Sequence, residues 1–70
     1  MYRKHDVMIR REDIEKAFRI LIKLENDGDV DRWSFIRWNG NTVCCSIAPI
    51  ISDDLESIKN KFRESGIRIL

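Results

Sequence analysis

The sequence predicts a small α+β protein with one antiparallel sheet and two helices packed on one of its faces. Two segments carry apolar side chains at helical spacing, residues 32–38 and 42–48 flank an Asn-Gly turn, and short apolar runs lie near both ends. The 70 residues, 43% hydrophobic and 36% charged, make one domain over residues 1–70. Within it, we expect residues 1–5 to form a mobile N-terminal arm.

The first two predicted elements are a strand and a helix. Val7 to Ile9 is an apolar run between charged flanks, which is typical of a short strand. Glu12 and Asp13 suit the positive end of a helix dipole, so the helix is expected to begin there. Its apolar stripe consists of Ile14, Ala17, Phe18, Leu21 and Leu24. The Asn-Asp-Gly-Asp segment at residues 26–29 ends the helix.

The middle of the chain predicts a β-hairpin. Residues 32–38 and 42–48 are rich in aromatic and β-branched side chains, and Asn39-Gly40-Asn41 lies between them. Asn-Gly is a strong hairpin signal because both residues tolerate the positive φ of a type I′ turn. Pro49 ends the second strand.

A second helix and a closing strand follow the hairpin. Ser52 or Asp53 is expected to cap the helix, and Leu55, Ile58 and Phe62 form its buried stripe. Gly66 suits the left-handed position that ends a helix, and residues 67–70 alternate as a strand.

The resulting order is β-α-β-β-α-β, the ferredoxin-like arrangement of one antiparallel sheet with both helices on one face. An alternative is an αββα order with a longer first helix, because Val7, Ile14 and Leu21 are seven residues apart. That helix would place Arg10 and Arg11 near its positive end, where the dipole disfavours them, so the six-element order is preferred.

The expected hairpin register assigns each side chain to a face of the sheet. With a two-residue loop, Ser34, Ile36, Trp38, Val43, Cys45 and Ile47 face the helices. The opposite, open face then carries large apolar and basic side chains: Met8, Arg10, Trp33, Phe35, Arg37, Cys44 and Arg68. A slip of one residue would reverse the assignment for one strand.

Large aromatic side chains on an open face require an explanation. One is that the N-terminal arm or the Ile50-Ile51 segment covers Trp33 and Phe35. The favoured one is a protein interface, with the hairpin's first strand as a sheet edge open to pairing. We therefore expect a protein-binding module: a homodimer, an adaptor or a small inhibitor or regulator of a larger protein machine. The alternative is single-stranded nucleic acid, with bases on the aromatics and phosphates near the arginines.

The sequence carries no catalytic, cofactor or metal signature, and we expect no enzyme activity. Cys44 and Cys45 are adjacent, so they do not form an unstrained disulfide, and with His5 they fall short of a zinc ligand set. We expect Cys45 to be a small core residue and Cys44 to be half-exposed. No apolar run has the length of a membrane span, and a cytoplasmic location is expected.

Overall fold

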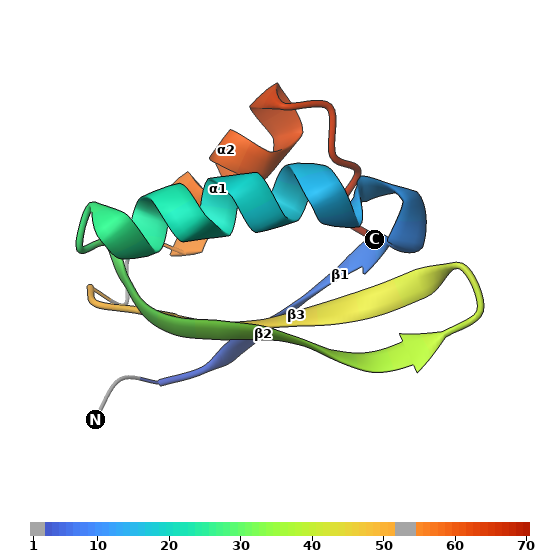
Figure 1. The fold of residues 1–70 in the computed structure, drawn as a ribbon, viewed down its shortest axis with the longest axis horizontal. Coiled ribbons are helices and arrows are strands. Elements are labelled where there is room, and N and C mark those ends of the chain that lie inside the picture. The colour runs from blue at the N-terminus through green and yellow to red at the C-terminus, as the bar shows by residue number, and fades with distance from the viewer. Residues whose placement is uncertain (1–2, 52–54) are drawn as a thin grey trace.

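The computed structural model describes residues 3–51 and 55–70 as two helices packed on one face of an antiparallel sheet (Figure 1). The elements are β1 (His5–Arg10), the single-turn helix η1 (Arg11–Asp13), α1 (Ile14–Asn26), β2 (Val30–Asn39), β3 (Thr42–Pro49) and α2 (Leu55–Glu64). The strands lie in the order β1-β3-β2, and both pairs of neighbours are antiparallel. The α+β class is therefore confirmed.

The segment before the first helix is a strand, so the αββα alternative is wrong. Val7 and Ile9 alternate inward and are buried, which is the period of a strand rather than of a helix. The strand begins at His5, so this end of the predicted mobile arm already belongs to the sheet. Residues 1 and 2 of that arm lie outside the described residues.

The C-terminal residues return to the sheet beside β1. Ile69 forms an antiparallel bridge with Ile9, and the Leu70 amide donates a hydrogen bond of 2.9 Å to the carbonyl of Met8. These two contacts place the end of the chain on the side of β1 that faces away from β3.

Both helices end as their glycines predict. Gly66 has a φ of 87°, and the next amide, that of Ile67, donates a hydrogen bond to the carbonyl of Phe62 five residues earlier. This Schellman bond turns the chain so that Ile67 is buried against the core. Gly28 ends α1 in the same way, with a φ of 82°. The predicted caps of α2, Ser52 and Asp53, lie outside the described residues.

The core lies between the helices and the inner face of the sheet. Its buried side chains come from every major element: Val7, Ile9, Ala17, Leu21, Leu24, Val30, Val43, Cys45, Ile47, Ile58, Phe62 and Ile67. The central strand β3 is buried on both faces from Val43 to Pro49.

The expected face assignment was correct for β3. In β2 it was wrong for residues 33–36, whereas Arg37 and Trp38 lie on the sides that were expected. Trp33 pairs with Ile47 and Phe35 with Cys45, so these aromatics lie on the helix-facing side. Ser34 and Ile36, expected beneath the helices, lie on the open face instead. The two-residue loop was right, but a bulge between Ile36 and Asn39 inserts one residue into β2. Arg37, with a φ of 54°, lies at this bulge.

We expect the left-handed backbone of Arg37 to affect the free energy of unfolding of variants at this position. Arg37→Asn and Arg37→Val both remove the guanidinium that pairs with Asp6 at 3.2 Å, but only asparagine tolerates this conformation well. Arg37→Val should therefore unfold with a free energy about 1 kcal/mol lower than Arg37→Asn, as measured by urea titration of tryptophan fluorescence. Equal stabilities of the two variants would contradict the bulge.

Candidate protein-binding edge

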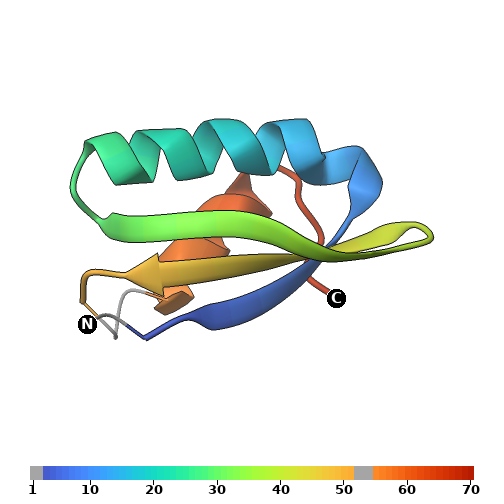
Figure 2. The same cartoon turned by 60° about the horizontal axis from the view of Figure 1, so that its bottom comes forward.

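β2 is an edge strand, as the six-element order predicts. Its one strand neighbour among the described residues is β3. Figure 2 shows β2 (green) at one edge of the sheet, with β3 on one side and α1 running along the other. Alternate backbone amides and carbonyls of an edge strand point away from the sheet and are free to pair with another chain.

Four aromatic rings form a continuous row along this edge, which we call the aromatic row: Phe18, Trp33, Phe35 and Trp38. Phe18 extends from α1, and its ring centroid lies 5.5 Å from that of Trp33. Trp33 and Phe35 are 5.6 Å apart, and Phe35 and Trp38 are 6.4 Å apart. All three pairs meet edge to face, the arrangement that aromatic quadrupoles favour.

The aromatic row is anchored in the core at its centre and exposed at its flanks. Trp33 and Phe35 are half-buried and pack against core residues. Phe18 keeps 44% and Trp38 53% of its surface accessible to solvent. The row is therefore rigid and still offers apolar area to a partner.

Opposite charges lie toward the two ends of β2, beside the aromatic row. Near the start of β2, Glu25 of α1 accepts a hydrogen bond of 3.3 Å from the indole nitrogen of Trp33. At the hairpin end, the Arg11 guanidinium lies 5.3 Å from the ring centroid of Trp38. Arg11 also donates a hydrogen bond of 3.0 Å to the carbonyl of Gly40, which ties the hairpin tip to the β1–α1 turn.

The residues expected to share the open face are divided between different parts of the molecule. Trp33 and Phe35 lie on the helix-facing side because of the bulge, and α1 covers them in part through Phe18. Met8 and Cys44 are neighbours on the open face, as expected. Arg37 reaches over that face to Asp6. Cys44 is only 2% exposed, so the expectation of a half-exposed thiol was wrong.

Arg10 and Arg68 lie at the other edge of the sheet, on β1 and on the C-terminal segment beside it, away from β2. Arg10 pairs with Glu12 at 3.0 Å and with the buried Asp13 at 3.3 Å, which stabilises the turn from β1 into α1. Arg68 is exposed on the C-terminal segment beside β1. The predicted combination of aromatic and arginine side chains on one open face is therefore wrong.

Three members of the observed edge were not singled out as site residues from the sequence: Phe18, Trp38 and Arg11. One signal for Trp38 was available. Trp33 and Phe35 are two residues apart, whereas Phe35 and Trp38 are three apart, and a strand that keeps all three on one face must contain a bulge.

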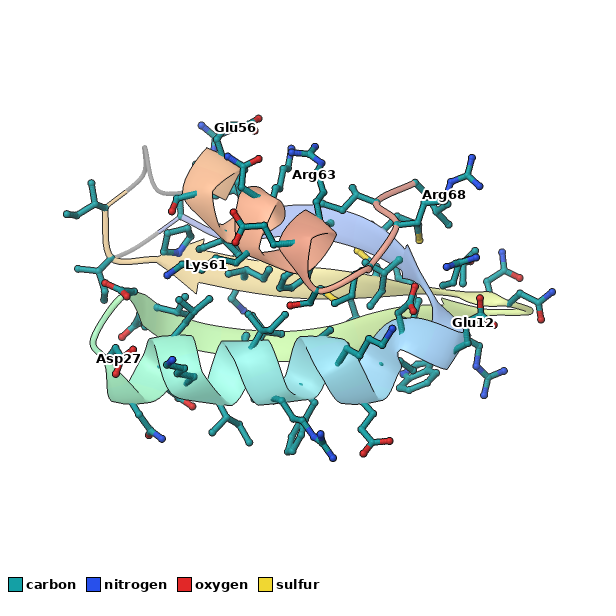
Figure 3. All side chains as sticks on the ribbon, turned by 90° about the horizontal axis from the view of Figure 1, so that it is seen from above. Glu12, Asp27, Glu56, Lys61, Arg63 and Arg68 are labelled. Carbon is teal, nitrogen blue, oxygen red and sulfur yellow. The ribbon has the colours of Figure 1, made fainter. Side chains whose placement is uncertain are left out.

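The helix layer carries mixed charges and a cleft. Figure 3 views it from above, with Asp27, Lys61 and Arg63 among the labelled charged side chains. A cleft of about 300 Å³ between α1 and α2 is lined by both basic and acidic side chains, including Lys23, Lys61, Asp27 and Glu64. Within residues 3–51 and 55–70, no three His, Cys, Asp or Glu side chains are grouped to hold a metal, and no helix has the length and hydrophobicity to span a bilayer.

Both cysteines are free, and their surroundings disfavour the thiolate. Burial raises the pKa of the Cys45 thiol to about 12. Burial, and then the negative charge of Asp6, also raise the pKa of Cys44 above its ordinary value of 9.0. Because the thiolate is the nucleophilic form, neither side chain is activated for catalysis at neutral pH.

Comparison with known proteins gives no further guide to function. No protein-family model matches the chain, and no curated protein or solved structure is significantly similar to it. The case for a function therefore rests on the geometry of the β2 edge.

The buried Cys45 thiol should make stability fall at alkaline pH. In the unfolded chain this thiol ionises near 9.0, whereas in the folded protein it holds its proton to about 12. The free energy of unfolding should therefore decrease as pH rises above the unfolded value, by up to about 1 kcal/mol near pH ~10 from this group. Urea unfolding near pH 7 and pH ~10 should show a smaller decrease for Cys45→Ala than for the wild type. Parallel decreases in the two proteins would contradict this assignment.

Proposed function

We propose that this protein is a non-catalytic protein-binding module whose binding surface is the outer edge of β2 together with the aromatic row. The observation that carries the proposal is the uninterrupted row of four rings beside an unpaired strand edge. Unpaired backbone groups supply affinity for an added strand, and adjacent side chains supply specificity.

We also propose that residues 67–70 act as the fourth strand of a ferredoxin-like βαββαβ sheet. The support is the bridge between Ile69 and Ile9 and the hydrogen bond from Leu70 to Met8. A strand in this position covers the outer edge of β1. The edge of β2 then remains as the open one, which directs strand addition to the aromatic side of the molecule.

The composition of the edge favours a protein partner. Trp, Phe and Arg are enriched in the cores of protein interfaces, and Trp and Arg are frequent hot spots. Edge-to-face contacts hold the rings in place, so little side-chain entropy remains to be lost on binding.

The same edge is less suited to nucleic acid. Trp33 is half-buried, with Phe18 and Phe35 against its ring and Glu25 on its indole nitrogen, so much of the surface on which a base would stack is already occupied. Glu25, which no ion pair neutralises among the described residues, places a negative charge beside Trp33, which disfavours a phosphate there.

The non-catalytic part of the proposal rests on the thiols. The raised pKa values of Cys44 and Cys45 keep both protonated at neutral pH, and both side chains are buried. Two free thiols also suit the reducing cytoplasm, which is where we place the function.

The proposal predicts which surface variants abolish capture of a partner. Tagged wild-type protein is incubated with an extract of its native host, alongside a variant carrying Phe18→Ser and Trp38→Ser. Both side chains are exposed flanks of the aromatic row, so the fold should persist while apolar binding area is lost. We expect the wild type to retain a protein that the double variant does not, as measured by quantitative mass spectrometry.

Met8→Ser is the matched control, because Met8 is an apolar residue with 37% exposure on the open face of the sheet. It should retain the same protein as the wild type, and treatment with nuclease should not release it. Retention by the double variant, loss with Met8→Ser, or release by nuclease would each contradict the proposed edge or the proposed class of partner.

A further inference from the structure

We propose that the β2 edge receives one extended segment of a different protein, paired antiparallel with Arg32–Ile36, rather than the β2 strand of a second copy. The inference rests on the proposed function and adds the partner's chemistry to it. The segment carries apolar side chains toward the aromatic row, an acidic side chain toward Arg11 and a basic side chain toward Glu25.

The pairing stretch follows from the register of β2. The register shifts between Val30 and Arg32 and again between Ile36 and Asn39, so regular pairing runs from Arg32 to Ile36. Bulges bend a strand and interrupt its ladder, and they therefore limit an added strand to this stretch. An antiparallel neighbour places two of its side chains opposite Trp33 and Phe35, on the side that faces α1.

The position of α1 decides against a second copy. Figure 3 shows α1 lying over β2 along the outer margin of the sheet, and Phe18 of α1 contacts Trp33 of β2. A two-fold axis relating two antiparallel β2 strands would put both α1 helices on the same side. Since paired strands are about 4.8 Å apart, the two helices would be nearly as close, whereas packed helices need about 8–10 Å.

An extended segment without a helix of its own meets no such obstacle. A single added strand would continue the sheet beside β2, in the layer below α1, and would bring no second helix into the helix layer. Phe18 projects from that flank, so apolar side chains of the segment would lie between Phe18 and the strand edge. The added strand thereby buries the exposed flanks of the aromatic row.

The charges toward the two ends of β2 define the segment's polarity. Glu25 lies beside Trp33, near the start of β2, and Arg11 lies beside Trp38 at the hairpin end. Both side chains are exposed and are not otherwise neutralised by an ion pair among the described residues. An antiparallel segment begins at the hairpin end, so its acidic residue precedes its basic residue.

Synthetic heptapeptides test this polarity directly. The first is Glu-Thr-Ile-Thr-Ile-Thr-Lys, whose odd positions all face α1 when the peptide is paired antiparallel, and the second exchanges its Glu and Lys. Titration into the ¹⁵N-labelled protein should shift the amides of Arg32–Ile36. We expect the first peptide to bind at least about fivefold more tightly than the second.

Exchanging the charges of the protein should reverse the preference. The variant with Glu25→Lys and Arg11→Glu should favour the second peptide, while Asp27→Lys with Arg63→Glu, which changes charges elsewhere, should keep the wild-type preference. Equal binding of both peptides, amide shifts confined to other elements, or a preference that the exchange leaves unchanged would overturn the inference.

Sedimentation of the purified wild type distinguishes failure of this inference from failure of the proposed function, which is protein binding at the β2 edge. We expect a monomer at about 100 μM, a concentration at which an interface with micromolar affinity would be mostly dimeric. A dimer that Phe18→Ser with Trp38→Ser converts to a monomer would overturn the inference and leave β2 as the binding edge. The peptides could also fail to bind while the capture of a host protein still depends on the aromatic row. That result would overturn the inferred chemistry of the segment and leave the proposed function in place.

Discussion

The bulge at Arg37 determines which side of the sheet is occupied by the β2 side chains that precede it. One extra residue lies between the hairpin turn and the body of the strand, and Arg37 adopts a positive φ there. Because side chains alternate along a strand, this single insertion moves Trp33 and Phe35 from the open face to the face beneath α1. It also brings Trp38 to the same side as Phe35, three residues away. Without the bulge, the aromatic row would not exist.

The aromatic row is an extension of the core that the chain itself covers only in part. A chain of this size buries about 60% of the surface that it exposes when unfolded, so apolar side chains remain at its margins. Here they are concentrated on one strand edge and one helix flank. The open face instead carries the small side chains of Cys44, Ser46 and Ala48 on its central strand, which their neighbours already bury. On the proposed function, a partner at the aromatic row would add burial where this small core lacks it.

Local sequence signals predicted the elements well, whereas the register depended on tertiary structure. Gly28 and Gly66 end their helices as their conformational freedom predicts, and Asn39-Gly40-Asn41 forms the hairpin turn. The bulge could not be located in this way, because Arg37 has no intrinsic preference for positive φ. What stabilises it there is packing: Trp33 and Phe35 gain contacts beneath α1 that exceed the local strain of one residue. The uneven spacing of the three β2 aromatics is the feature of the sequence that reflects this bulge.

The placement of α1 over β2 bears on how an open strand edge can avoid pairing with a second copy. An exposed strand edge ordinarily invites pairing between identical copies, and bulges or a covering helix are the usual protection. In this protein the bulges shorten the pairing stretch to Arg32–Ile36, and α1 occupies the space that the helix of a second copy would need. On our proposal, neither feature obstructs a lone extended strand. The geometry that we expect to disfavour pairing of two copies would then also select the kind of segment that the edge accepts.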